Sequence, residues 1–395
     1  MLSVRSFYSS GADFSALSTQ IKATTPHTAD LCFVFGNVTL LERFAQQTDL
    51  LSSSKKWLGG SSCLGVGADL GMDLEQGSLT LLQINDPRGA YGVAAGMMPL
   101  TDIEQQASRL VQQAMTDAGR AAQTPDLVWC FQAPGQEEAV LSGIRAVVGK
   151  HVPIFGGSAA DDTLNGDWKL FDGHNMATDL LVIAVLYPSA PLYGYFSAGY
   201  TLTRCSGKVT AATSREILAI DHQPAAQVYL AWSQLEKEQS VDKQMILAQS
   251  ALQPLGRIIN QIEGIPLTLL SHPVYINQAD GLGLFTEISV GDDIWMLRGD
   301  ADQLVRRAAQ VVAVSRDALS EQDVNPVGAL IVFCAGCMLA VRGQMADVRA
   351  AIAAEIPGLP FTMVFTYGEQ GCFADGQSRH GNLMISAVFF GSTDA

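Results

Sequence analysis

The sequence predicts an α/β protein of two lobes, in which mixed β-sheets are covered by helices. The chain has 395 residues, which is more than a single hydrophobic core usually serves. Its apolar strands are continuous in Val, Ile, Leu and Phe, as expected for sheets that are buried on both faces. Amphipathic helical stretches separate these strands, and this alternation is typical of the α/β class.

One strand–helix–strand pattern occurs three times in approximate form. In each copy an apolar strand ends in a polar turn, a helix follows, and a second strand runs into a Gly-rich turn. The three copies cover residues 31–69, 127–162 and 328–372. Further strands after these turns are expected to pair antiparallel, which makes the sheets mixed. They cover residues 78–84, 179–187 and 382–390.

We expect three segments along the chain. Residues 1–30 form an N-terminal extension, residues 31–220 the N-terminal lobe, and residues 221–395 the C-terminal lobe. The boundary lies where a charged stretch of helical character, residues 224–262, separates the two halves. That stretch also offers a surface for a homodimer.

Composition excludes several classes of function. The formal charge is −15 and no cluster of Lys or Arg interrupts it, so we expect no nucleic-acid partner and no binding to an anionic membrane surface. No apolar run reaches the roughly 18 residues that a membrane helix needs. The N-terminal sequence lacks the features of a secretory signal, so the expected location is cytoplasmic.

The seven cysteines are odd in number and scattered, which favours buried thiols over a disulfide framework.

Turns that follow the strands of α/β proteins are common ligand sites, because the sheet holds them while their backbone groups stay free. The Gly-rich turn 59–71 has neither of the usual phosphate-loop spacings, so nucleotide binding is not expected. Cys334 and Cys337 form a CxxC after a strong apolar strand. Two buried core thiols are favoured there, with a redox or metal role as the alternative.

Tyr367, Gly368 and Glu369 follow another apolar strand, where a phenol and a carboxylate face the end of the sheet. They are either ligand-anchoring residues or an ordinary turn. One acid is not a catalytic mechanism, since general acid–base catalysis needs a partner with a matched pKa.

The six histidines occur singly, without the spacing of a metal site. A surface or structural role is favoured for each of them. His272 and His380 are the better candidates for a ligand role, because each stands beside an apolar strand. One such imidazole and an apolar slot would suffice for non-covalent haem.

Seven motifs follow one another along the chain. They are LGGSSCLGVGAD, PIFGGSAADD, the joining segment 194–229, HPVYIN, GALIVFCAG, FTYGEQG and RHGNLMISAVF. In this order they resemble the FIST family, bacterial intracellular sensory domains with an N-terminal and a C-terminal part, over roughly residues 30–390. Two positions depart from the family pattern. Cys337 stands where the family commonly has an Arg, for which Arg342 is a substitute, and the motif at His380 reads His-Gly-Asn instead of His-Asn.

The resemblance implies a non-catalytic sensor of a small ligand that reports to a histidine kinase, a cyclase or a chemotaxis protein on a separate chain. Chains of this kind are also similar to NosP-type haemoproteins, which bind haem and sense nitric oxide, so haem b is a candidate cofactor. On this interpretation His272 is the first choice for the axial ligand of the haem iron, and His380 is the second candidate. His272 is expected to bind a metal only if haem is bound. The expected ligand-binding residues are Cys334, Arg342, Tyr367, Gly368 and Glu369.

Two alternatives accompany the haem interpretation. The first is a sensor of amino acids or other small metabolites that works without haem. The second is a thiol-dependent enzyme that uses Cys334 or Cys337, which would require a lowered thiol pKa and a nearby base.

Overall fold

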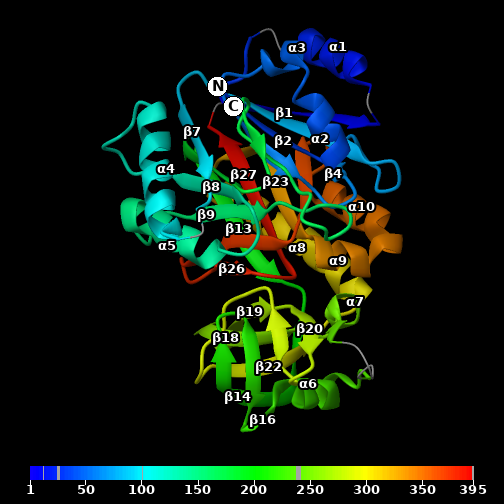
Figure 1. Ribbon diagram of the computed structural model, residues 1–395. Helices are drawn as coiled ribbons and strands as arrows, with labels where there is room; N and C mark the ends of the chain where they lie inside the picture. The colour runs from blue at the N-terminus through cyan, green and yellow to red at the C-terminus, as the bar shows by residue number, and fades with distance from the viewer. Residues whose placement is uncertain (12, 25–26, 100, 237–241, 394–395) are drawn as a thin grey trace.

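The computed structural model describes residues 1–395 except 12, 25–26, 100, 237–241 and 394–395. It confirms the predicted α/β class with mixed sheets and covering helices. Three six-stranded mixed sheets form the larger part of the molecule, and a nine-stranded antiparallel sheet forms the smaller part below it (Figure 1). Within the described residues, no helix has both the length and the apolar character needed to cross a membrane.

The three mixed sheets share one strand order: an edge strand, an antiparallel strand, two parallel strands and a short hairpin. The first sheet contains β1 (Ser3–Ser10), β6 (Ser78–Asn85), β2 (Leu31–Gly36), β3 (Trp57–Ser61), β10 (Leu170–Phe171) and β11 (Met176–Ala177). The second contains β7 (Ala90–Met97), β12 (Leu180–Tyr187), β8 (Leu127–Gln132), β9 (Ile154–Ser158), β25 (Gly368–Cys372) and β26 (Ser378–Gly381). The third contains β13 (Leu192–Ala198), β27 (Met384–Ser392), β23 (Asn325–Cys334), β24 (Phe361–Thr366), β4 (Val66–Ala68) and β5 (Gly71–Met72).

The short hairpins exchange between the repeats and close them into a ring. The hairpin β4–β5 follows β3 in the chain but pairs with β24. In the same way β10–β11 follows β9 but pairs with β3, and β25–β26 follows β24 but pairs with β9. Each Gly-rich turn of the predicted repeat is therefore a crossing point from one sheet to another.

Three backbone hydrogen bonds join these crossing turns to one another. The amide of Ala160 donates to the carbonyl of Ser61, the amide of Cys63 to that of Phe365, and the amide of Tyr367 to that of Ser158. Each N···O distance is 3.1 Å. The bonds run in one direction around the ring, so each turn satisfies a carbonyl group of another repeat.

Helices cover the sheets through apolar stripes. The buried residues of α8 (Ala301–Ser320) follow the three- and four-residue spacing that places them on one face. Asp300 and Gln303 form a capping box at its first turn. The other helices of this part are α1 (Phe14–Thr24), α2 (Val38–Phe44), α3 (Thr48–Leu51), α4 (Ile103–Asp117), α5 (Glu137–Val148), α9 (Ala335–Ala340) and α10 (Met345–Glu355).

The described residues between 201 and 298 form the nine-stranded sheet and its helices, here called the β-insertion, between β13 and α8. It has its own apolar core, which includes Val209, Tyr229 and Ile276. Its strands are β14 (Thr201–Thr213), β15 (Glu216–Ile220), β16 (Gln223–Pro224), β17 (Lys243–Met245), β18 (Leu255–Ile262), β19 (Ile265–Ser271), β20 (Pro273–Asn277), β21 (Leu282–Leu284) and β22 (Asp293–Arg298). Its helices are α6 (Ala225–Ser233) and α7 (Leu247–Ser250).

The predicted helical stretch 224–262 is largely wrong. Helix α6 ends at Ser233, and β17, α7 and β18 follow, while residues 237–241 lie outside the described residues. Strand β18 forms because it pairs with both β19 and β22, and this tertiary pairing outweighs local helix propensity.

The expected division into an extension and two lobes, with boundaries after residues 30 and 220, stays a prediction. The structure shows what lies at each boundary. Residues 1–30 are not detached, because β1 pairs with β6 along its whole length at the edge of the first sheet. The boundary between residues 220 and 221 falls inside the β-insertion, between β15 and β16.

Candidate ligand-binding site

A pocket of about 260 Å³ lies where α5 and β26 meet the β-insertion. Its wall is rich in charged side chains of both signs. The wall consists of Glu138, Leu141 and Arg145 of α5, Arg257 and Leu269 of the hairpin β18–β19, Glu287 and Ser289, and Arg379 and His380 of β26. Because both parts of the molecule contribute to it, we call it the junction pocket.

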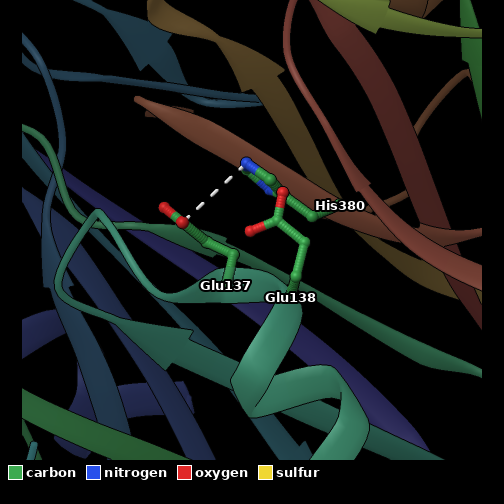
Figure 2. A group of neighbouring side chains, drawn as sticks. All are labelled: Glu137, Glu138 and His380. Atoms are coloured by element: carbon green, nitrogen blue, oxygen red, sulfur yellow. Dashed lines mark ion pairs between the residues drawn. The ribbon is translucent and has the colours of Figure 1, made fainter. Parts of the chain in front are cut away.

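A group of ionisable side chains lies beside this pocket, and two of them, Glu138 and His380, also line it. Figure 2 shows Glu137, Glu138 and His380 of this group. Glu137 and Glu138 come from the first turn of α5, and His380 comes from β26. Arg215, from the loop between β14 and β15, donates to both carboxylates through Nη2, with an N···O distance of 2.7 Å to Glu137. We call these four residues the Arg215 cluster.

Local structure places the two acids at this point. The strand β8 ends in a polar turn and α5 begins at Glu137, so both carboxylates lie at a helix N-terminus, where negative charge is favoured. Glu137 Oε1 accepts hydrogen bonds from the amide of Gly135 at 3.0 Å and from Ser158 Oγ at 2.8 Å. Glu138 Oε1 accepts one from the amide of Glu287 at 3.0 Å.

The charges around Glu137 keep it ionised. Burial alone would raise the pKa of this carboxyl group, because it disfavours the charged form. The neighbouring imidazole of His380, the Arg215 guanidinium and the hydrogen bonds outweigh that effect and hold the pKa of Glu137 at about 2. The carboxylate and the guanidinium are therefore a buried ion pair across the junction between α5 and the β-insertion.

The same group could be read as a metal site, since one ligand atom from each of Glu137, Glu138 and His380 lies within 4.8 Å of the others. The charge balance argues against that reading. Arg215 already bridges the two carboxylates and compensates part of their negative charge without a metal ion. A metal ion would have to displace a buried guanidinium.

His380 retains unused hydrogen-bonding capacity. Its ring is buried, and Nδ1 lies 3.3 Å from Gln370 Nε2. Its Nε2 lies 3.9 Å from Glu137 Oε2, within ion-pair distance, but has no hydrogen-bond partner among the described residues. A buried polar atom without a partner in the wall of a pocket is a natural contact for a ligand.

Gly368 is the one other predicted site residue beside His380. A Cβ atom at this position would lie 2.5 Å from His380 Cε1 and 3.2 Å from Ser158 Oγ. The glycine is therefore needed for close packing of the imidazole, not for binding by its own atoms.

Glu369 and Cys334 lie together in the core, away from the junction pocket. Glu369 accepts hydrogen bonds from Thr366 Oγ1 at 3.0 Å and from the amide of Met384 at 3.1 Å. Burial raises the pKa of the Glu369 carboxyl group and of the Cys334 thiol well above their usual values. A thiol with a raised pKa is mostly protonated at neutral pH, which makes Cys334 a poor nucleophile.

The side chains of Tyr367 and Arg342 bond to neighbouring loops. The Tyr367 hydroxyl donates to the backbone carbonyl of Asp161 at 2.6 Å and lies 2.8 Å from its carboxylate. Arg342 is exposed, and its guanidinium pairs with Glu75 at 2.7 Å. Of the five residues expected to line one ligand site, Glu369 and Cys334 are thus neighbours, while Gly368 lies against His380, Tyr367 bonds to Asp161 and Arg342 pairs with Glu75.

His272 is buried where the β-insertion contacts α9: its ring centroid lies 5.9 Å from that of Phe285, and a Cβ atom at Gly336 would lie 3.2 Å from its Cε1. Its Nε2 lies 2.9 Å from the carbonyl oxygen of Leu247, which assigns the ring proton to that nitrogen. A haem iron would need this nitrogen free, and the pocket beside the second candidate, His380, is lined mainly by charges rather than by an apolar slot. Neither environment fits haem.

Burial of His272 predicts an acid-sensitive fold. It lowers the pKa of the imidazole to about 4 from the ordinary 6.5. The unfolded chain therefore binds a proton near pH 6.5 while the native protein resists it, so the stabilisation is complete above pH 6.5 and is lost as the pH falls towards 4. Chemical denaturation at both pH values should show a loss on the order of 3 kcal/mol in the wild type.

The variant His272→Gln should lack this particular loss, while His151→Gln, at an exposed position, should retain it. An equal loss in all three proteins would show that other groups cause the acid sensitivity.

The junction pocket and the Arg215 cluster contain residues that sequence reasoning missed. Arg145, Arg215, Arg257 and Glu287 carry no local motif, and only the paired acids after the polar turn of β8 gave a signal that could have been read. The five cysteines that are buried agree with the expected core thiols, while Cys205 and Cys372 are partly exposed.

Comparison with known proteins gives the family. The FIST N domain matches residues 30–223, and the FIST C domain matches residues 225–372. No curated protein matches the sequence. His380 and β27 lie beyond the matched residues.

The solved structures similar to this chain differ strongly from it in sequence. A cyanuric acid hydrolase from A. caulinodans has 11% identity and a TM-score of 0.40, with 100% of each chain covered. A second cyanuric acid hydrolase structure has 11% identity and a TM-score of 0.36, with 98% of this chain and 99% of the other covered. T. maritima PurL, complexed with ATP, has 8% identity and a TM-score of 0.20, over 99% of this chain and 71% of the other.

Together the two domain matches cover nearly the whole chain, in the order that the sequence motifs indicated. The FIST domains are sensory domains that bind small ligands, and this chain belongs to the FIST family.

Proposed function

We propose that the protein is a non-catalytic sensor that binds a small zwitterionic metabolite, such as an amino acid, in the junction pocket. The observation that carries this proposal is the wall of that pocket, in which positive and negative side chains from both parts of the molecule face a space of about 260 Å³. A ligand with one carboxylate and one ammonium group complements such a wall.

Arg145 is the proposed partner of the ligand carboxylate. Its Nη2 donates to the carbonyl oxygen of Ser378, and it forms no ion pair with a carboxylate of the described chain. Burial and the nearby Arg379 lower the pKa of Arg145, which means that its positive charge lacks compensation. A carboxylate at this position would supply that compensation.

Glu287 is the proposed partner of the ammonium group. Burial and the neighbouring Glu138 raise the pKa of Glu287, so negative charge accumulates on that side of the pocket. A cation placed there would relieve the repulsion between the two carboxylates.

The position of the pocket suggests how binding becomes a signal. Arg145 and His380 belong to the larger part, whereas Arg257 and Glu287 belong to the β-insertion. A ligand that contacts both favours one arrangement of the two parts over others. A histidine kinase, a cyclase or a chemotaxis protein would read that change, as proposed for this family at large. A haem-bound nitric oxide sensor has less support, because the environments of His272 and His380 do not fit haem.

Titration calorimetry with the standard amino acids tests this proposal. At least one of them should bind, and Arg145→Gln should weaken its binding by about tenfold or more, because a charge-assisted hydrogen bond is lost. The control is Arg109→Gln, at an exposed position of the neighbouring helix α4, which should leave the Kd unchanged. The proposal fails if no amino acid binds, or if the two variants affect binding equally.

A further inference from the structure

A second pocket, of about 390 Å³, lies at another part of strand β19. Ile265, Pro266, Leu267 and Thr268 line this pocket, whereas the next residue, Leu269, lines the junction pocket. The opposite wall of the second pocket comes from β13 and from Arg307 of α8.

The charge in this pocket is of one sign. Arg307 is the one charged residue in the wall. Its Nη1 donates to Gln310 Oε1 at 3.2 Å and its Nη2 donates to Ser197 Oγ. Its Nε is buried and has no partner, and the guanidinium forms no ion pair among the described residues.

This isolation is costly for the folded chain. Burial lowers the pKa of Arg307, which is the mark of a guanidinium removed from water without an opposite charge beside it. The hydrogen bonds to an amide and a hydroxyl do not neutralise it. An anion that enters the pocket would do so, and would gain a charge-assisted hydrogen bond.

The rest of the wall is mainly aromatic and apolar. Tyr195, Phe196, Tyr200 and Phe373 line it, and the rings of Phe196 and Phe373 pack edge to face with centroids 5.0 Å apart. Leu267 completes an apolar side on the β-insertion. Such walls favour a flat, apolar ligand body.

We propose that this second pocket, the Arg307 pocket, binds a small monocarboxylate with an aromatic body. The carboxylate pairs with the guanidinium, and the ring lies among the aromatic side chains. A single cation matches a single negative charge better than the double charge of a phosphate group. The site differs from the junction pocket in its residues and in its charge, so it does not depend on the function proposed above.

Titration calorimetry with benzoate tests the assignment. Benzoate should bind, whereas benzamide, which has the ring without the charge, and acetate, which has the charge without the ring, should each bind about tenfold more weakly or worse. Arg307→Gln should weaken benzoate binding by about tenfold or more. The control is Arg306→Gln, at the exposed neighbouring position, which should leave the Kd unchanged.

Two further variants make the outcome decisive. Thr268→Glu adds a carboxylate to the pocket wall and should abolish benzoate binding even if Arg307→Gln does not fold. Arg145→Gln should not affect it, so a failure of the amino-acid proposal and a failure of this one can be told apart. The proposal is overturned if benzoate does not bind, if benzamide binds as tightly, or if Arg307→Gln and Thr268→Glu both retain the wild-type affinity.

Discussion

Replacement of Arg215 by Met should lower the free energy of unfolding by about 3–5 kcal/mol, the usual cost of removing one partner from a buried ion pair. The guanidinium bridges Glu137 and Glu138, and it also donates to the carbonyl oxygen of Phe285. Without it, a carboxylate that is almost completely buried faces a second carboxylate with no bridging cation. Urea denaturation of the wild type and the variant at pH 7 measures the difference.

Matched variants show whether the loss comes from charge. Arg204→Met, at an exposed position of β14, should cost less than about 1 kcal/mol, as surface substitutions usually do. The triple variant Arg215→Met, Glu137→Gln, Glu138→Gln should recover part of the stability, because the unpaired charges are then absent. If Arg215→Met costs no more than Arg204→Met, the ion pair does not hold the β-insertion to α5.

The second large effect is expected for Gly59→Ala. Gly59 lies in β3, where a Cβ atom would come within 1.7 Å of the carbonyl oxygen of Val34 in the neighbouring strand β2. Backbone cannot yield as a flexible side chain can, so the parallel pair must separate. We expect a loss of about 3 kcal/mol or more, at or beyond the upper end of what overpacking usually costs.

The control for this substitution is Gly343→Ala. An added Cβ atom at Gly343 has open space around it, and neither glycine has a positive φ, so neither substitution is disfavoured by the backbone conformation. Thermal unfolding should show a lower Tm for Gly59→Ala and little change for Gly343→Ala. Similar values for both would mean that the strands adapt more easily than the close approach implies.

Local sequence carried enough information for the class of fold and its repeat. Runs such as Leu127–Gln132 and Asn325–Cys334 form buried strands because an uninterrupted apolar segment must be covered on both faces. Helices α5 and α10 were also visible, since their apolar residues have helical spacing, whereas α9, directly after Cys334, was expected to be strand and turn. The order of the Gly-rich turns also identified the family, which the domain matches confirm.

Local sequence could not predict which strands pair with one another in the sheets. Strand β18 appeared helical, because its partners β19 and β22 are needed to make it a strand. The exchanged hairpins were hidden too, since β25 reaches β9 across about 200 residues of chain. Long-range pairing of this kind is decided by how whole elements fit, not by the propensity of one segment.

The candidate site shows the same division. His380 was singled out from the sequence as a lone imidazole beside an apolar strand, and it lines the junction pocket. The sequence also grouped Tyr367 with Glu369 as ligand-anchoring residues, although the Tyr367 hydroxyl bonds to Asp161 and the Glu369 carboxylate to Thr366 and Met384. Tyr367 precedes β25, which begins at Gly368, so the strand does not fix the two side chains on one face.

By itself, then, the sequence determined the α/β class, the threefold repeat and the family, because each depends on patterns within a short stretch of chain. The tertiary structure decided which charges meet. Arg145, Arg257 and His380 belong to three separate elements and share one pocket, and Arg215 compensates acids 77 and 78 positions before it. Such contacts arise only when the β-insertion packs against α5, since electrostatic interactions depend on distance in space and not on distance along the chain.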